Sequence, residues 1–233
     1  MRPDALVLIS GPPGSGKTTC LREALALLAA RGHSVRACLS EATARTSRAG
    51  GPLALGFDLL MLETQAGGLA ESGRFPLARR DPPVPGPEPL RKRMQAFTFD
   101  FSAFPQALSF LRNSGEVLSG SAGTPVPEIM ALDEIGPLEL HENGGFMPFL
   151  LEMAACRTDH RKGHEKQEPS CTRFLLLTVR PSLIDELAGL LSGLFGTARV
   201  ERAVLGENDD GCIMAEAKRI ADYVSETEDG YHG

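Results

Sequence analysis

Short apolar runs along the chain alternate with segments in which apolar residues recur every three or four positions. The runs predict buried strands, and the helical spacing predicts amphipathic helices. Expected strands cover residues 5–9, 34–39, 55–62, 69–75, 97–101, 129–134, 173–179 and 200–205, and expected helices cover 21–31, 104–111, 146–155, 182–191 and 213–224. Because strands alternate with helices, the pattern predicts an α/β fold with a doubly wound, mostly parallel sheet flanked by helices.

Polar and proline-rich segments interrupt this pattern. Residues 41–51 lack an apolar stripe and are expected to form a loop. Residues 80–93 are rich in proline, which removes a backbone donor, and residues 157–170 are strongly charged, so both segments are interpreted as loop insertions. We expect a single domain over 1–225 and a flexible tail over 226–233.

The composition is that of a globular chain of 233 residues with a net charge of −6. This charge argues against nucleic acid or an anionic membrane surface as the main partner. No apolar run approaches the roughly 20 residues that a membrane-spanning helix needs. The five cysteines include no paired CxxC motif, which is typical of a reducing compartment. The sequence therefore predicts a cytoplasmic monomer without a membrane segment.

A glycine-rich stretch between the first strand and the first helix matches the P-loop pattern in full. Its glycines allow backbone amides to turn toward phosphate oxygens, and the positive end of a helix follows. Lys17 would neutralise the β- and γ-phosphates, and the Thr18 hydroxyl would ligate Mg²⁺. The predicted nucleotide-binding residues of this stretch are Gly11, Pro12, Pro13, Gly14, Ser15, Gly16, Lys17, Thr18 and Thr19.

A second motif, Ile-Met-Ala-Leu-Asp-Glu, spans residues 129–134 and reads as a Walker B strand. The apolar run would bury itself in the sheet and bring Asp133 to the carboxyl edge, where ligands bind. There Asp133 would hold Mg²⁺ together with Thr18, usually through water. Glu134 would orient or deprotonate the attacking water, so we regard Glu134 and Lys17 as catalytic candidates. Arg180 follows the strand at 173–179 and is a further candidate at the same edge.

A cluster of metal-ligating residue types lies inside the charged insertion. Cys156, His160, His164 and Cys171 follow a C-x3-H-x3-H-x6-C spacing and carry the ligand atoms of tetrahedral zinc. The C-x3-H spacing is unusual for zinc, and the residues between them are mostly charged. A solvent-exposed insertion without metal is the favoured interpretation, with zinc as the alternative.

Several segments occur in an order that resembles the cancer-related nucleoside-triphosphatase family, small P-loop proteins of bacteria, archaea and vertebrates. They are the P-loop with Thr19, Ser47-Arg48, Gly50-Gly51, Leu55-Gly56-Phe57-Asp58, Leu77-Ala78-Arg79 and the run 132–140. The most specific piece is Asp-Glu-Ile-Gly-Pro-Leu-Glu-Leu, and the resemblance covers roughly residues 1–155. It departs from the family at Pro52 and Leu53, where a basic residue is common, and at 208–210, where an arginine is missing.

The resemblance implies Mg²⁺-dependent hydrolysis of nucleoside triphosphates to diphosphate and phosphate, with broad base tolerance. Arg48 and Arg79 lie in the family-like segments and join Arg180 as candidates for contacts to the transition state. Asn208, near the carboxyl end of the last expected strand, is the candidate for a contact to the base.

Two other functions share the P-loop and Mg²⁺. A nucleotide or small-molecule kinase would need a second pocket and a basic lid, for which Arg79, Arg80 and Arg91 to Arg93 are candidates. A nucleotide-dependent switch is the third possibility, although the Asn-Lys-x-Asp element of guanine-specific switches is absent from the sequence. Hydrolysis is favoured because Glu134 offers a carboxylate for water and no motif for an acceptor stands out.

Overall fold

The computed structural model describes residues 3–46, 52–66, 68–80, 91–94, 97–112, 128–155, 172–196, 199–206 and 210–229. Within this part of the chain nine strands form one sheet in the order β5-β6-β4-β3-β2-β7-β8-β1-β9. The strands are β1 Ala5–Ser10, β2 Val35–Thr46, β3 Pro52–Gln65, β4 Gly68–Arg80, β5 Arg91–Met94, β6 Phe97–Asp100, β7 Ile129–Ile135, β8 Phe174–Val179 and β9 Arg199–Val204.

The strands β2, β7, β8, β1 and β9 pair in parallel. All residues of β1 and β8 are buried, which explains why both strands read as unbroken apolar runs rather than alternating ones. The helices are α1 Lys17–Ala30, α2 Ala103–Arg112, α3 Pro137–Glu142, α4 Met147–Ala155, α5 Ile184–Phe195 and α6 Asp210–Asp229, with a short 3-10 turn at Pro181–Leu183.

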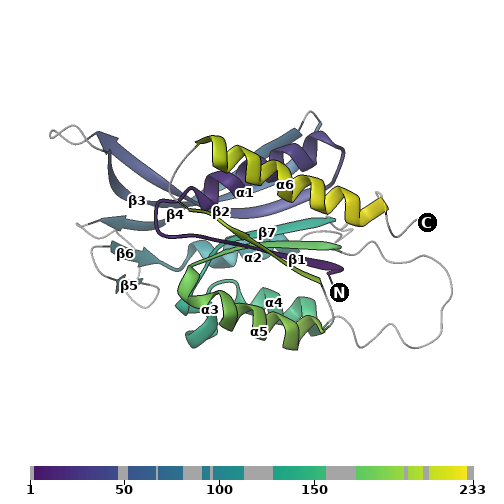
Figure 1. Ribbon diagram of the computed structural model, residues 1–233. Helices are drawn as coiled ribbons and strands as arrows, with labels where there is room; N and C mark the ends of the chain where they lie inside the picture. Colours follow the sequence, from purple (N-terminus) through teal and green to yellow (C-terminus); the bar gives the residue numbers. More distant parts are fainter. Residues whose placement is uncertain are drawn as a thin grey trace, which may run out of the picture.

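The helices form two layers on opposite faces of the sheet. Figure 1 shows α1 and α6 together on one face and α3, α4 and α5 on the other. Each layer encloses its own apolar core: Leu21, Leu25 and Leu28 of α1 pack in the first, and Leu150 of α4 packs in the second. The predicted α/β class with helices on both faces is therefore confirmed.

Four strands extend the sheet in an antiparallel arrangement. The pairs β2–β3, β3–β4, β4–β6 and β6–β5 are all antiparallel. In Figure 1 this antiparallel extension (β3, β4, β5 and β6) reaches past the ends of the parallel strands, on the side where β1 enters the P-loop and away from both chain termini. The sheet is thus parallel in one half and antiparallel in the other.

Four local expectations differ from the structure. Residues 41–46 are not a loop but the second half of β2, which pairs with β3 up to Thr46↔Pro52. This half has no apolar stripe because residues 41–43 are half-buried or exposed, so pairing rather than burial holds them. The expected loop 80–93 begins and ends in strands, since Arg80 closes β4 and β5 begins at Arg91, while 81–90 lie outside the described residues.

The other two differences concern helices. Helix α6 continues to Asp229, so the first four residues of the expected tail 226–233 are helical and the last four lie outside the described residues. Helix α3 was not expected from the sequence. Its six residues are too few to show a helical apolar period, although Pro137 at its first turn is a favourable start.

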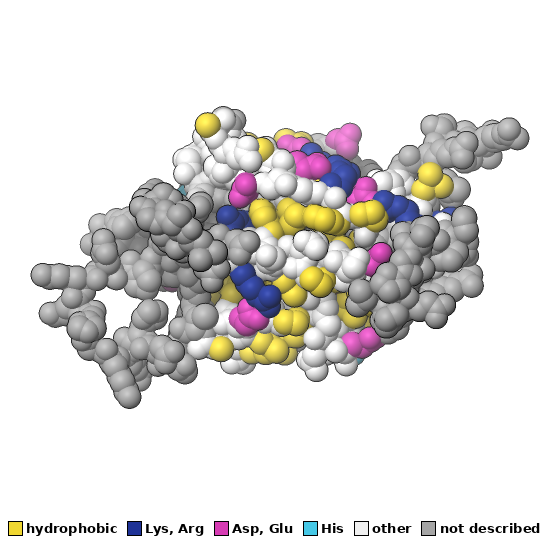
Figure 2. All heavy atoms as spheres, turned by 180° about the vertical axis from the view of Figure 1, so that it is seen from behind, with side chains coloured by type: hydrophobic (Ala, Val, Ile, Leu, Met, Phe, Trp, Pro, Cys, Tyr) yellow, Lys and Arg dark blue, Asp and Glu magenta, His cyan; other side chains and the backbone are white. Residues whose placement is uncertain are grey.

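The surface in the described ranges mixes charges of both signs. In the view of Figure 2, Lys and Arg side chains lie next to Asp and Glu side chains, and hydrophobic side chains form a band between them. Among the described helices none is long and apolar enough to cross a membrane.

Candidate nucleotide-binding site

The P-loop joins the end of β1 to the start of α1 and depends on its glycines for shape. Gly14 and Gly16 have φ values of 79° and 82°, in the left-handed region that favours glycine. A Cβ atom on Gly11 would lie 2.4 Å from the Ser15 hydroxyl oxygen and 2.8 Å from the Leu205 carbonyl oxygen. Three glycines of the motif are therefore required by the backbone geometry itself.

Lys17 begins α1 and folds back over the loop. Its Nζ donates hydrogen bonds to the carbonyl oxygens of Gly11 at 2.8 Å and Pro12 at 2.9 Å. Burial lowers the pKa of Lys17, and the nearby carboxylates of Glu134 and Asp133 oppose this effect. The ammonium group is therefore positioned above the loop, where backbone amides and a helix N-terminus favour phosphate.

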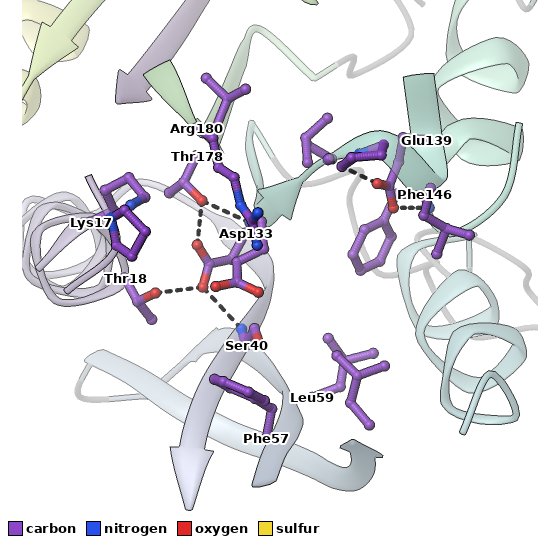
Figure 3. Close-up of a pocket in the computed structure, with 18 of the residues that line it drawn as sticks. Lys17, Thr18, Ser40, Phe57, Leu59, Asp133, Glu139, Phe146, Thr178 and Arg180 are labelled. Atoms are coloured by element: carbon purple, nitrogen blue, oxygen red, sulfur yellow. Dashed lines mark hydrogen bonds between the residues drawn. The ribbon is translucent and has the colours of Figure 1, made fainter. Parts of the chain in front are cut away.

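Asp133 is the centre of a hydrogen-bond network that joins three strands and α1 (Figure 3). Its side chain is 3% exposed. Oδ2 accepts the Thr18 hydroxyl at 2.8 Å and the Ser40 backbone N–H at 3.0 Å, and Oδ1 accepts the Thr178 hydroxyl. Burial raises the pKa of Asp133, while the hydrogen bonds from Thr178, Thr18 and Ser40 act in the opposite direction. The network holds the carboxylate in one orientation next to the P-loop.

The two acidic residues, Asp133 and Glu134, lie in a β-bulge of β7. The β7–β8 register runs regularly to Leu132↔Leu177 and resumes at Ile135↔Val179. Within the bulge Glu134 has a φ of 59°, which is unusual for a residue other than glycine, and its N–H donates to the Thr178 hydroxyl at 2.7 Å. Strained backbone of this kind is concentrated at functional sites.

The carboxyl group of Glu134 has a pKa that lies near neutral pH. Its side chain reaches solvent in the cavity, but the surrounding protein displaces much of its water and, together with the Asp133 carboxylate, raises the pKa of Glu134 to about 7. Arg180 and Lys17 act in the opposite direction. A carboxylate with this pKa can accept a proton near neutral pH.

The oxygen atoms around Asp133 suit Mg²⁺. Thr18 and Asp133 supply a hydroxyl and a carboxylate, and Mg²⁺ prefers such ligands while keeping several waters. The hydroxyl oxygens of Ser40 and Ser15 are buried and have no hydrogen-bond partner within the described part of the chain. Of the two, Ser40 lines the cavity and its N–H binds Asp133, so its unsatisfied hydroxyl lies where a hydrated cation would present a partner.

Glu139 fixes the segment that follows the acidic pair. Its carboxylate is 3% exposed and accepts the N–H of Gly136 at 3.0 Å and the N–H of Phe146 at 3.2 Å. A Cβ atom on Gly145 would lie 1.9 Å from Glu139 Oε1, so the carboxylate occupies the space that a side chain there would need. The family-like run after Asp133 therefore has a structural role: it ties the start of α3 to the turn before α4.

One cavity of about 550 Å³ contains both the P-loop end and a region with apolar walls. Figure 3 shows Lys17 and Thr18 on one side of Asp133, with Glu139 and Phe146 on the other and Phe57 and Leu59 from the antiparallel extension below. We call the apolar region the aromatic chamber; its defining side chains are Phe57, Leu59, Phe99, Phe101, Phe104 and Phe146.

The candidate arginines have different surroundings. Arg180 lines the cavity at the carboxyl end of β8, beside the acidic pair. Arg79 does not line it; its guanidinium forms an ion pair with Asp58 and donates to the carbonyl oxygens of Phe57 and Ala78, both at 2.8 Å. Thus Arg180 is placed where it could contact a phosphate, whereas the guanidinium of Arg79 is bound by groups of β3 and β4.

The pairing of Arg79 explains why two separate family-like segments occur together. In the β3–β4 register Gly56 lies opposite Arg79, and a Cβ atom on Gly56 would be 2.9 Å from Arg79 Cδ. Gly56 therefore makes room for the arginine, and Asp58 binds its charge. Arg48, Asn208 and the four zinc candidates Cys156, His160, His164 and Cys171 lie outside the described residues, as do the side chains of Arg91, Lys92 and Arg93.

Sequence reasoning missed Ser40, Thr178 and the aromatic chamber. A hydroxyl residue inside the otherwise apolar run of β8 was a usable signal for Thr178, and Ser40 directly follows the expected strand 34–39. The phenylalanines gave no such signal, because they read as ordinary core residues. Their side chains meet only when β3, β6, α2 and the start of α4 come together.

Comparison with curated proteins identifies relatives of one family. The chain is 33% identical over 135 residues to the cancer-related nucleoside-triphosphatase homolog of Bos taurus and 30% identical to that of Mus musculus, and it is 33% identical to the cancer-related nucleoside-triphosphatase of Homo sapiens. This part of the chain is homologous to the cancer-related nucleoside-triphosphatases. The match covers 58% of this chain and spans 61% of the length of the curated relatives. The family resemblance drawn from the motifs is confirmed over this part.

A solved structure shares the fold. It is the crystal structure of THEP1 from the hyperthermophile Aquifex aeolicus, with a TM-score of 0.50 and coverage of 91% of this chain and 95% of that chain. At 16% identity the similarity concerns the fold alone. No family model matches the chain.

Proposed function

We propose that this protein is a Mg²⁺-dependent nucleoside-triphosphatase that converts nucleoside 5′-triphosphates into diphosphate and phosphate. The observation that carries the proposal is the contact between the Thr18 hydroxyl and Asp133, 2.8 Å apart, with Glu134 as the next residue. It joins the P-loop to a carboxylate on β7, which β8 separates from β1, as a magnesium triphosphate requires. The homologous nucleoside-triphosphatases support the same reaction.

The triphosphate would be bound by the P-loop and Lys17. Backbone amides of the loop would bind the phosphates, and the Lys17 ammonium, now bonded to the carbonyl oxygens of Gly11 and Pro12, would bind β- and γ-phosphate oxygens instead. Thr18 and Asp133 would hold Mg²⁺, with the buried Ser40 hydroxyl next to it. When bound there, the cation would supply positive charge to the phosphate oxygens.

Glu134 would orient the attacking water and accept its proton. Its side chain lines the cavity next to the bulge, and its raised pKa of about 7 makes it a better proton acceptor than an ordinary glutamate. Arg180, which lines the cavity beside the acidic pair, would stabilise negative charge in the transition state. In this assignment Arg79 has a structural role, because its guanidinium is already bound by Asp58.

The test is phosphate release from ATP, GTP, CTP and UTP with and without Mg²⁺, in the absence of any other acceptor. We expect phosphate release that requires Mg²⁺. Lys17→Ala should lose tight triphosphate binding in calorimetry and keep its circular dichroism spectrum, because Lys17 faces the phosphate site rather than the core. No phosphate release from any of the four nucleotides would contradict the proposal.

We also propose a reducing compartment such as the cytoplasm. The support is that Cys20, Cys38 and Cys212 are free thiols, two of them buried. Labelling with a thiol reagent after unfolding should count five reactive cysteines without reductant; fewer would contradict the assignment.

A further inference from the structure

The aromatic chamber provides space and apolar surface that the binding of phosphates and Mg²⁺ does not require. It forms part of the cavity that Glu134 also lines, and side chains of β3, β6, α2 and the start of α4 build its walls. Phe57, Phe99, Phe101 and Phe104 are half-buried, so part of each ring faces the cavity and is not covered by other protein atoms. Apolar walls with a few directed polar groups are typical of sites for small organic molecules.

The rings of the chamber support one another and form a preorganised wall. Phe99 and Phe101 have ring centroids 6.4 Å apart, Phe101 and Phe104 6.1 Å, and Phe104 and Phe146 5.3 Å. The last pair meets edge to face, with an interplanar angle of 79°. These distances lie in the range of favourable aromatic contacts, and a wall of this kind is suited to an aromatic ring.

The strand order argues against the base of a bound nucleotide as the occupant of the chamber. In the sheet the P-loop strand β1 lies on one side of β7, and β3 and β6 lie on the other. The γ-phosphate end of the triphosphate would be at Thr18 and Asp133, so the rest of the nucleotide extends away from the chamber. A molecule in the chamber would therefore meet the γ-phosphate from the side of the attacking nucleophile.

The charges of the site describe the occupant further. Among the described residues that line the cavity, the cations are Lys17 and Arg180, and both lie at the phosphate end. Glu134 lines the same cavity and offers its carboxylate, while the two oxygens of Glu139 already accept backbone N–H groups. An uncharged molecule with a hydroxyl group fits this arrangement better than one that carries its own phosphate.

We propose that the aromatic chamber binds an uncharged aromatic alcohol or phenol whose hydroxyl replaces water as the acceptor of the γ-phosphoryl group. The hydroxyl oxygen attacks the γ-phosphorus, the bond from that phosphorus to the β–γ bridging oxygen breaks, and its electron pair leaves with the diphosphate. The acceptor's proton passes to Glu134. This inference rests on the proposed nucleotide site, and it adds phosphoryl transfer to a small molecule as a second activity of that site.

The experiment uses phenol, 2-naphthol, benzyl alcohol and 2-phenylethanol as probes with Mg²⁺ and ATP. Phosphate esters and free phosphate are quantified in the same reaction by ³¹P NMR, and 2-naphthol binding is followed by its fluorescence. We expect at least one phosphate ester, and we expect 2-naphthol to bind equally well when a non-hydrolysable triphosphate occupies the P-loop. No ester from any of the four probes, or competition between 2-naphthol and the nucleotide, would overturn the proposal.

Two substitutions in α2 provide a matched pair. Phe104 lies in the chamber wall. Phe110, six residues later on the same helix, does not line the cavity; the Arg36 guanidinium carbon lies 4.9 Å from its ring centroid. Phe104→Ala should weaken 2-naphthol binding by about tenfold or more, the scale of one lost aromatic contact with its buried area, and Phe110→Ala should leave it within about twofold. Phe104→Leu, which keeps the apolar volume, serves if Phe104→Ala does not fold. Equal binding in all variants would place the ligand elsewhere and overturn the assignment.

The outcomes separate this inference from the proposed hydrolysis. Phosphate release without any ester would support the proposed hydrolysis and contradict the proposed acceptor site. If esters form with the probes but no phosphate is released without them, the proposed hydrolysis is contradicted and the acceptor site is supported.

Discussion

The two halves of the sheet use their side chains differently around one cavity. The parallel half presents polar atoms at its carboxyl edge, where Asp133 is held by Thr18, Ser40 and Thr178 and the P-loop turns at the end of β1. The antiparallel extension presents phenylalanines to the same cavity and keeps its charges in ion pairs such as Arg79–Asp58. The polar edge of the parallel half suits charged phosphates, and the phenylalanines of the antiparallel extension suit an apolar molecule.

The two halves of the sheet meet different chemical requirements of the site. Phosphate and cation chemistry needs fixed dipoles and charges, which the ends of parallel strands and the start of α1 supply. Recognition of an apolar partner needs shape, which strands at the edge of the sheet can vary without disturbing the P-loop. The following experiments change a residue in one half of the sheet, or the nucleotide itself, and measure the effect on turnover or stability.

The largest effect is expected from Arg180→Ala, in the parallel half. An arginine that meets charge only in the transition state is worth about 10³-fold in turnover at the low end of measured cases, with little change in nucleotide affinity. Steady-state hydrolysis and calorimetry separate the two quantities. Arg202→Ala is the control, because Arg202 forms an exposed pair with Asp185 outside the cavity wall. Turnover at the parental rate would show that the protein has no intrinsic arginine contact of this kind at Arg180.

Glu134→Gln should reduce hydrolysis by about 10²-fold, the scale of a lost general base, and should retain nucleotide binding. The substitution keeps the shape of the side chain and removes its basicity. Glu152→Gln on α4 is the matched control, since Glu152 pairs with Arg112 at the surface. If both variants turn over alike, the proton acceptor must be another group.

The pH profile of hydrolysis should reveal the same glutamate. Because its pKa is raised to about 7 and the base must be deprotonated to act, kcat/KM should rise about tenfold per pH unit below that value and level off above it. The rise should disappear in Glu134→Gln. A profile that is flat between pH 5 and 8 in the parent protein would argue against proton transfer to Glu134.

Arg79→Met tests the structural role of the antiparallel extension. Removing the guanidinium leaves Asp58, which is 7% exposed, without its main partner, and hydrogen bonds to charged groups are worth about 1.5–3 kcal/mol. We expect the free energy of unfolding in urea to fall by about this amount. Arg112→Met, which breaks an exposed pair, should cost about 1 kcal/mol or less. A loss of turnover at full stability would instead return Arg79 to the list of catalytic candidates.

The smallest effect is expected from changing the base of the nucleotide. The groups at the phosphate end do not contact a base, and the aromatic chamber lies on the far side of the γ-phosphate. ATP, GTP, CTP and UTP should therefore have kcat/KM values within about tenfold of one another, or roughly 1.4 kcal/mol. A thousandfold preference would reveal a pocket that reads the base; Asn208 was the sequence candidate for such a contact.

The sequence by itself determined the position of the proposed phosphate site. The P-loop and the acidic pair are local patterns whose backbone requirements can be read from the residues, and Gly14, Gly16 and Asp133 lie where such patterns require. The buried strands β1, β7 and β8 were equally visible, because an unbroken apolar run has few alternatives in an α/β fold.

Only the tertiary structure decided what surrounds that centre. Ser40 and Thr178 reach Asp133 because strand order places β2 and β8 on either side of β7, and the positive φ of Glu134 arises from the mismatch between β7 and β8. Arg79 became a structural residue through its pairing with Asp58 across β3 and β4. Contacts of this kind join residues far apart in sequence, and their geometry depends on strand register and helix packing, which no local pattern specifies.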